Sequence, residues 1–378
     1  MTQMVSEVKV REFVVDLLDP VMHQKRAESI GLAVVGCMYT ERLGSAGIGA
    51  AMASARGKSA KHGIKQVDRL VGNDKFDVAE AFKAYVPCVV GARKSIVTTM
   101  DWTEYPGDGH SRIAINLVTK HGRATPLVWL TVESATLKNR RNEYEDEALL
   151  LLSRVLPGDV QVTVLADRGF GDEKLYRFMQ ELQWDFVIRF RGCILVESKD
   201  GESAKAEELV PPNGRIRELP EAKVTYRGTQ VGAVVLVKKR GMKEAWFLAT
   251  SFEGRKDWVV KLYGRRFTCE ENFRDEKDGR FGLGFRQTRV STCERRDRFL
   301  LINALATVLL TLLGAAGEKL GLDRHLKSNT ARRRIHSLLC QGRWYMRCVV
   351  RVHVEALREL LWKLVAQQRS ATALFGAI

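Results

Sequence analysis

Short apolar segments rich in β-branched residues occupy the middle of the chain. They lie at residues 94–105 (KSIVTTMDWTEY), 112–120 (RIAINLVTK) and 126–133 (PLVWLTVE). Runs of this kind, separated by polar or glycine-containing stretches, are typical of β-strands. Because the three follow one another closely, we predict that they form an antiparallel meander.

Helix-like and strand-like segments alternate in the stretch that follows. Residues 142–156 have helical spacing, with Asn142 as the expected N-cap and acidic residues in the first turn. An apolar strand at 160–167 comes next, then a helix at 172–183 and a strand at 184–190. Three hairpin strands followed by helix, strand, helix and strand describe a mixed α/β sheet of the ribonuclease-H-like type.

The segments on either side of this pattern indicate how the chain is divided. Residues 193–251 alternate like strands and are broken by prolines and glycines, which predicts a β-rich insertion in the sheet. The apolar stretch 299–317 is at the lower limit for a membrane span, and Asn303 interrupts it, so we expect a buried helix that covers the sheet. The expected parts are a helical N-terminal region at 1–90, a core formed by 91–192 and 252–294, the insertion at 193–251, and a helical C-terminal region at 295–378.

One short segment concentrates charged residues at helical spacing. Tyr263, Arg266, Glu270 and Lys277 are separated by three, four and seven positions, which places them on one face of a helix with Arg274 beside them. A single carboxylate among cations and a phenol suits a metal ion and a phosphate bound together. The alternative is a set of surface i,i+4 ion pairs, each contributing about 0.3–0.5 kcal/mol.

Two further acidic residues precede this segment. Asp101 and Asp167 each follow an apolar run, so we expect both at or near strand ends, where side chains from adjacent strands converge. An aspartate in such a place is often only a turn former or a helix cap. Together with Glu270, however, the two aspartates form a set of hard oxygen ligands, which indicates phosphodiester chemistry with divalent cations.

The composition agrees with a polyanionic partner. Lys and Arg number 61 against 45 Asp and Glu, a formal net charge of +16, and the pI is about 9.6. Such a field attracts nucleic acid, although net charge does not distinguish DNA from RNA or from a membrane surface. Basic clusters lie at residues 55–69, 238–243, 265–280 and 324–336.

The cysteines and histidines show no familiar site pattern. The seven cysteines are scattered, with no CxxC pair and no zinc-type spacing to histidine. This distribution favours reduced thiols in a cytoplasm over a disulfide framework. Cys269, next to Glu270, is expected to be a packing residue.

These motifs resemble those of the DDE transposases of the insertion-sequence-four family of bacterial mobile elements. The family signature, Tyr-x2-Arg-x3-Glu-x6-Lys, matches at Tyr263, Arg266, Glu270 and Lys277, and the contexts MDWTEY and ADRGFGD surround the two aspartates. The resemblance extends from about Lys58 onward and is weakest at the N-terminus and at 193–245. It implies a β-rich insertion between the second aspartate and the glutamate.

The expected roles of the site residues follow. Asp101, Asp167 and Glu270 would be catalytic and would bind two Mg²⁺ ions, for which Mn²⁺ can substitute. Trp246 is either a core residue of its strand or, like an aromatic in related enzymes, a plate on which a displaced base stacks, and Phe267 is a second candidate for stacking. The residues expected to contact DNA are Tyr263, Arg266, Arg274, Lys277, Trp246 and Phe267.

The resemblance also implies an activity. The enzyme would bind DNA through its helical N-terminal region at 1–90, cut double-stranded DNA at the terminal inverted repeats of its element and join the ends to target DNA. Two protomers would hold the two ends. Its expected location is the bacterial cytoplasm, at the nucleoid, with no membrane partner. Two alternatives stay open: a ribonuclease-H-like nuclease that cuts without joining, and a non-catalytic DNA-binding repressor of transposition.

Overall fold

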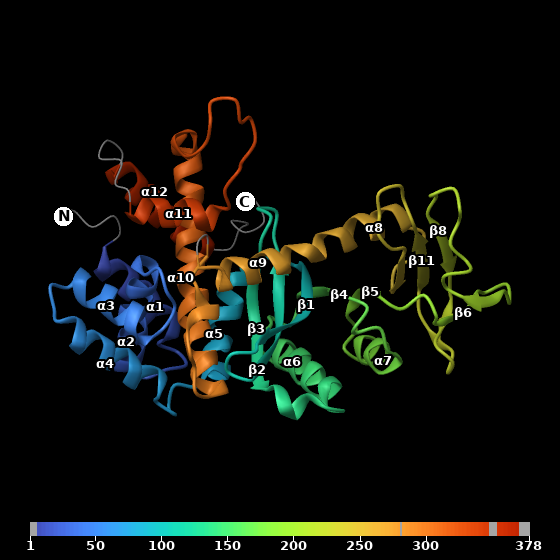
Figure 1. The fold of residues 1–378 in the computed structure, drawn as a ribbon, viewed down its shortest axis with the longest axis horizontal. Helices are drawn as coiled ribbons and strands as arrows, with labels where there is room; N and C mark the ends of the chain where they lie inside the picture. The colour runs from blue at the N-terminus through green and yellow to red at the C-terminus, as the bar shows by residue number, and fades with distance from the viewer. Residues whose placement is uncertain (1–5, 280–281, 348–353, 370–378) are drawn as a thin grey trace.

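The computed structural model describes residues 6–279, 282–347 and 354–369. Helices cover both ends of the chain, and strands occupy its middle (Figure 1). The α-helices are α1 (Glu7–Leu18), α2 (Gln24–Tyr39), α3 (Ser45–Ala55), α4 (Ala60–Val71), α5 (Val78–Val90), α6 (Arg141–Val155), α7 (Glu173–Glu181), α8 (Lys256–Gly264), α9 (Thr268–Lys277), α10 (Cys293–Lys319), α11 (Leu338–Arg347) and α12 (Val354–Arg369).

The strands form two sheets. The main sheet has eight strands in the order β3-β2-β1-β4-β5-β12-β11-β8, and the smaller sheet has the order β10-β9-β6-β7. The strands are β1 (Ser95–Tyr105), β2 (His110–Val118), β3 (Ala124–Glu133), β4 (Gln161–Ala166), β5 (Asp185–Arg189), β6 (Leu195–Glu197), β7 (Ser203–Lys205), β8 (Arg217–Pro220), β9 (Lys223–Val224), β10 (Thr229–Gln230), β11 (Ala233–Val237) and β12 (Trp246–Thr250).

The main sheet is mixed. Strands β1, β2 and β3 form the predicted antiparallel meander, whereas β4 pairs in parallel with both β1 and β5. Parallel strands need a crossover between them, and α6 and α7 supply these connections. The predicted mixed α/β sheet with flanking helices is confirmed, and its strand order is compatible with the ribonuclease-H-like type.

The strands of 193–251 belong to both sheets. Strands β8, β11 and β12 extend the main sheet beyond β5, and the four short strands make the smaller sheet at the far end of the molecule (Figure 1). Strand β11 is buried along its whole length, because it lies between β8 and β12 and is covered by α8. The division of the chain into the four parts stays a prediction.

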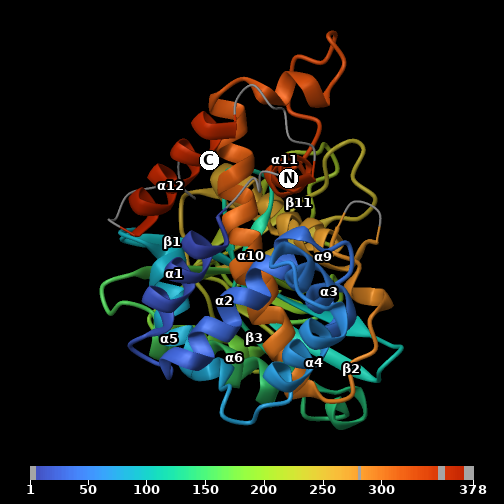
Figure 2. The ribbon, with the colours of Figure 1, turned by 90° about the vertical axis from the view of Figure 1, so that its left-hand side faces the viewer.

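Helix α10 is the long apolar helix expected from residues 299–317. Within the described residues it alone is long and apolar enough to cross a membrane, and 94% of its most apolar window is buried inside the protein. Figure 2 shows it running through the molecule between the N-terminal helices and the sheet. Its apolar composition is therefore explained by contacts with α2, α11 and β3.

The N-terminal helices pack closely with one another. Gly49 of α3 and Gly63 of α4 face each other, and a Cβ on Gly63 would lie 2.2 Å from the carbonyl oxygen of Gly49. Any larger side chain at either position would force α3 and α4 apart. This contact holds α4 so that Val67, Leu70 and Val71 are buried and the opposite face is exposed.

The predicted start of α6 needs correction. Helix α6 begins one residue before Asn142, with Arg140 at the N-cap position, so Asn142 does not cap it. The Asn142 side-chain amide instead donates a hydrogen bond to Asp172, at 2.7 Å. Asp172 is itself the N-cap of α7, accepting from the backbone N–H of Leu175. Asn142 therefore ties the starts of α6 and α7 together.

Candidate active site

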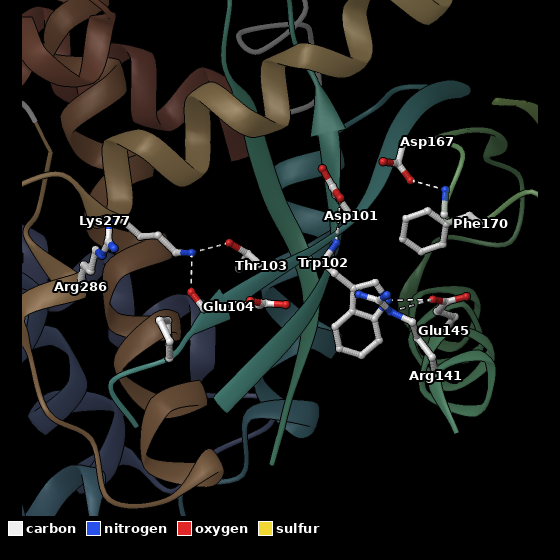
Figure 3. Close-up of a pocket in the computed structure, with 12 residues that line it drawn as sticks. Asp101, Trp102, Thr103, Glu104, Arg141, Glu145, Asp167, Phe170, Lys277 and Arg286 are labelled. Atoms are coloured by element: carbon white, nitrogen blue, oxygen red, sulfur yellow. Dashed lines mark hydrogen bonds and ion pairs between the residues drawn. The ribbon is translucent and has the colours of Figure 1, made fainter. Parts of the chain in front are cut away.

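Two aspartates from neighbouring parallel strands face the same pocket. The pairing of β1 with β4 ends at Met100 and Ala166, and Asp101 and Asp167 are the next residues on the two strands. Figure 3 shows their side chains close together at the edge of the pocket. Asp167 lies just after β4, as predicted, but Asp101 lies inside β1, since that strand continues to Tyr105 through its pairing with β2. The tertiary effect is the same, because β4 stops beside Asp101.

The environment of Asp101 makes its negative charge costly. Burial raises the pKa of Asp101, and the nearby carboxylate of Asp167 raises it further, whereas Arg266 lowers it. Its Oδ1 accepts from the backbone N–H of Trp102 at 2.9 Å. Two carboxylates that approach each other in a partly buried place require positive charge nearby.

The signature segment does not form one straight α-helix. Helix α8 ends at Gly264, a 3-10 turn spans Arg265–Phe267, and α9 begins at Thr268. The 3-10 turn interrupts the α-helix, but Tyr263, Arg266 and Glu270 stay neighbours: Arg266 pairs with Glu270, and it opposes the rise that burial causes in the pKa of Tyr263. Arg266 and Lys277 both contact residues of β1, and Tyr263 packs against β12.

Arg266 links two of the three predicted catalytic acids. Its Nη1 lies 3.1 Å from Asp101 Oδ2, and its Nη2 lies 2.5 Å from Glu270 Oε1. The Arg266 side chain is buried, whereas half of the Glu270 side chain is exposed. The guanidinium therefore supplies the positive charge next to Asp101. Cys269 is a buried packing residue as expected, and its thiol donates to the same Oδ2 at 3.5 Å.

Lys277 lines the pocket on the side away from Asp167. Its Nζ donates to Thr103 Oγ1 at 2.5 Å and to the Glu104 carbonyl at 2.8 Å (Figure 3). Burial lowers the pKa of Lys277 to about 8, although Glu276 opposes the shift. Arg286 lines the same side, and the pocket has a volume of about 510 Å³. Cations thus flank the two aspartates in a space open to a phosphate.

The other predicted DNA contacts lie outside the lining of this pocket. Arg274 is exposed and pairs with Glu271 at 3.2 Å. Tyr263 is buried and packs edge-on against Trp246, with ring centroids 4.9 Å apart. Phe267 is 43% exposed, and its ring lies 6.3 Å from that of Trp246. Trp246 is half-buried, so it is both a packing residue of β12 and part of an aromatic cluster beside Arg266.

Most residues that line the pocket were not foreseen from the sequence, and three of them form one wall. Trp102 donates from its indole N–H to Glu145 Oε1 at 2.7 Å, and the guanidinium of Arg141 lies 5.1 Å from the indole ring (Figure 3). Trp102 directly follows Asp101, which was the available signal, but Arg141 and Glu145 come from α6, over 30 residues away. Together they form a rigid aromatic and cationic wall beside the aspartates.

The burial of Glu145 predicts a pH dependence of stability. Burial raises the pKa of Glu145 from 4.5 to about 7. Below pH 4.5 the carboxyl holds its proton in the folded and unfolded chains alike; between pH 4.5 and 7 the unfolded chain loses it first, which destabilises the fold. Glu145→Gln keeps an acceptor for Trp102 and removes this loss. Urea unfolding should therefore show the variant gaining about 2 kcal/mol relative to the wild type between pH 5 and pH 8.

Glu147→Gln is the matched control for this prediction. Glu147 lies on the same helix and is exposed. Its replacement should change the unfolding free energy by less than about 0.5 kcal/mol at both pH values. An equal difference between Glu145→Gln and the wild type at pH 5 and pH 8 would show that Glu145 is not held in an unfavourable environment.

The carboxylate oxygens of the three acids are suitable ligands for hard divalent cations, but Glu270 does not lie directly beside the two aspartates. Asp101 and Asp167 converge, whereas Glu270 is joined to Asp101 through Arg266. In the described part of the chain, the three acids do not form a group whose ligand atoms all lie within 4.8 Å of one another. A cation shared by all three would therefore require the Glu270 side chain, which is half exposed, to turn from Arg266 toward the aspartates.

A different group of side chains has the spacing of a metal site. His110, Glu133 and Cys293 place one ligand atom each within 4.8 Å of one another. However, Arg296 Nε donates to His110 Nδ1 at 3.0 Å, so the neutral ring carries its proton on Nε2, which faces Glu133 at 3.4 Å. Histidine ligands normally donate from the nitrogen that does not bind the metal. We interpret this group as a hydrogen-bonded chain.

A buried network holds α9 against the sheet. Glu276 accepts from Tyr105 Oη at 2.5 Å and from Arg112 Nη1 at 2.9 Å, and all three side chains are buried. Arg296 of α10 lies over the Tyr105 ring at 3.9 Å. Because Glu276 adjoins Lys277 and follows Glu270 on the same helix, the network sets where both residues lie relative to β1.

Comparison with protein families gives a specific match. Residues 108–309 match the family described as Transposase DDE domain, over more than half of the chain. The chain belongs to this family. DDE transposases use divalent metal ions, which agrees with the oxygen ligands expected from the sequence. The matched residues of this transposase include Asp167 and the whole signature segment. It begins after Asp101, so the role of that residue rests on its position beside Asp167. Comparison with curated proteins gives no match.

Proposed function

We propose that this transposase cuts the ends of its element and joins them to target DNA, in the manner of the insertion-sequence-four family. The observation that carries the proposal is the convergence of Asp101 and Asp167 in a pocket flanked by Lys277, Arg286 and Arg141. Acids that hold cations, surrounded by bases that hold phosphates, suit in-line displacement at phosphorus.

The protein's own residues would position the DNA. Lys277 and Arg286 line one side of the pocket and Arg141 the other, so a phosphate between them meets positive charge from two directions. Lys277 is held by Thr103 and by the Glu104 carbonyl, which keeps its ammonium directed into the pocket. Arginine can grip a phosphate with two N–H groups, and lysine acts as a point charge. These side chains would hold the backbone on either side of the scissile bond.

The proposed cofactor is a pair of Mg²⁺ ions, with Mn²⁺ as a substitute. The carboxylates of Asp101, Asp167 and Glu270 would be the ligands of these ions. Mg²⁺ and Mn²⁺ bind well to carboxylate oxygens, so no cysteine or histidine ligand is needed. Bound ions of this kind make the attacking oxygen a better nucleophile and neutralise charge on the leaving oxygen. Arg266 would then keep its contact with Asp101 or pass to a phosphate when Glu270 turns toward the aspartates.

A joining assay tests the proposal. Purified protein is mixed with Mg²⁺, a labelled fragment that carries the DNA flanking the gene, and a supercoiled target plasmid. We expect cleavage at the end of the element followed by label in the plasmid. Cleavage without joined product would support a nuclease instead, and neither product in the presence of tight DNA binding would support a repressor. We also propose that two copies of the transposase form a homodimer that holds both ends of the element. The enzyme would act in the bacterial cytoplasm.

A further inference from the structure

A second concave surface lies on the N-terminal helices, away from the catalytic pocket. It has a volume of about 630 Å³ and lies between the start of α2 and one face of α4. Its lining has no acidic side chain. The residues are His23, Lys25, Arg26, Ser29, His62, Lys65, Gln66, Arg69, Leu70 and Asn73, and we call this surface the α2–α4 groove.

The charges of the groove are not neutralised within the protein. Among residues 6–279, 282–347 and 354–369, no carboxylate forms an ion pair with any of its four lysines and arginines or its two histidines. The buried Nε of Arg26 has no hydrogen-bond partner in the same residues. Like charges gathered in a concave surface raise the local potential and favour an anion there.

The backbone adds to this potential. Helix α2 begins at Gln24, and His23 caps it by accepting from the N–H of Lys25, so the positive end of this 16-residue helix faces the groove. The last turn of α4 also reaches the groove and brings partial negative charge, but Arg69 lies in that turn. Four full cations outweigh the partial charges of one helix end.

The arrangement fits a long anion better than a small one. His62, Lys65 and Arg69 follow one face of α4, a row of about 10 Å at 1.5 Å per residue, and Asn73 lies just beyond the end of the helix. Lys65 and Arg69 are one turn apart, about 6 Å, a distance that covers about two charges along one DNA strand. Gln66, Asn73 and Ser29 add neutral hydrogen-bonding groups between the cations. A single phosphate would occupy only part of this row.

We infer that the α2–α4 groove binds the phosphate backbone of a DNA duplex, as a site separate from the catalytic pocket. The inference rests on the proposed function for the identity of the polyanion as DNA. Its consequence is that one duplex is held at two places, the N-terminal helices and the catalytic sheet. The groove would contribute affinity and register, while the pocket performs the chemistry.

The test removes two charges from the groove. Lys65→Ala/Arg69→Ala changes exposed residues of α4, where alanine is a good helix former, so the fold should be retained. The control, Lys61→Ala/Lys83→Ala, also removes two exposed charges from the N-terminal helices, but neither residue lines the groove. Binding to a labelled duplex of about 30 base pairs is measured in EDTA over a range of salt concentrations.

The expected result is a change in both affinity and salt dependence. If each side chain contacts a phosphate, the groove variant should bind about 10- to 100-fold more weakly at low salt, and its slope of log K against log salt should fall by about 2. The control should stay within about threefold of the wild type with an unchanged slope. Equal slopes in the two variants would overturn the inference.

Lysine acetylation gives a second readout that does not depend on any substitution. Bound duplex should protect Lys25 and Lys65 of the wild-type protein, but not Lys61 or Lys83. Protection of Lys25 and Lys65 by inorganic phosphate or by polyglutamate, but not by the duplex, would overturn the assignment to DNA. Because these measurements need no metal and no cleavage, a groove that fails is distinguishable from a joining assay that fails.

Discussion

Replacing Asp101 or Asp167 with asparagine should lower end cleavage in Mg²⁺ at least about 10²-fold, because each change removes a charged oxygen ligand next to the scissile phosphate. DNA binding in EDTA should persist, since both substitutions remove negative charge from a pocket flanked by cations. Calorimetric titration with Mn²⁺ should show weaker metal binding in both variants. The measurements are cleavage of a labelled end, duplex binding and metal titration on the same preparations.

Asp159→Asn is the matched control for both variants. Asp159 precedes β4, at the opposite end of that strand from Asp167, and pairs with Lys94 on the surface. Its replacement should leave cleavage within about twofold of the wild type. Asp101→Asn is the sharper of the two tests, because that residue precedes the family match. Full cleavage by Asp101→Asn, with loss of cleavage by Asp167→Asn, would show that another residue completes the site.

Glu276→Ala should lower the free energy of unfolding by about 3–5 kcal/mol. The substitution leaves Arg112 buried without its carboxylate and removes the acceptor of the Tyr105 hydroxyl. An unpaired buried charge is far more costly than the loss of an exposed ion pair. Urea unfolding monitored by tryptophan fluorescence measures the change.

Glu271→Ala on the same helix provides the comparison. Glu271 pairs near the surface with Arg274 and Arg123, so its loss should cost no more than about 1 kcal/mol. A similar cost for Glu271→Ala and Glu276→Ala would contradict the assignment of Glu276 as the buried anchor of α9. Loss of that anchor should also reduce cleavage in the surviving folded protein, because Lys277 and Glu270 lie on the same helix.

The local elements could be predicted because their residue patterns are strong. The strands β2, β3 and β5 and the helices α6 and α7 follow apolar runs and amphipathic spacing, and the structure confirms each within a few residues. The apolar stretch 299–317 became a buried helix for the same reason: an all-round apolar helix needs apolar neighbours on every side. The predicted N-cap at Asn142 was wrong: the helix begins one residue earlier, and the Asn142 amide donates to Asp172, 30 residues away.

The site was only partly predictable. Residue types and their spacing are enough to show which side chains carry charge, that Asp167 follows a strand, and that Glu270 and Lys277 share a helix. Three other features depend on the folded chain: β4 stops beside Asp101, Arg266 reaches Asp101 from a 3-10 turn, and Glu145 of α6 accepts a hydrogen bond from Trp102. The physical reason is that spacing along one chain defines directions within a single element. Which charges meet depends on strand register, on the angle between helices, and on which carboxylates are buried together.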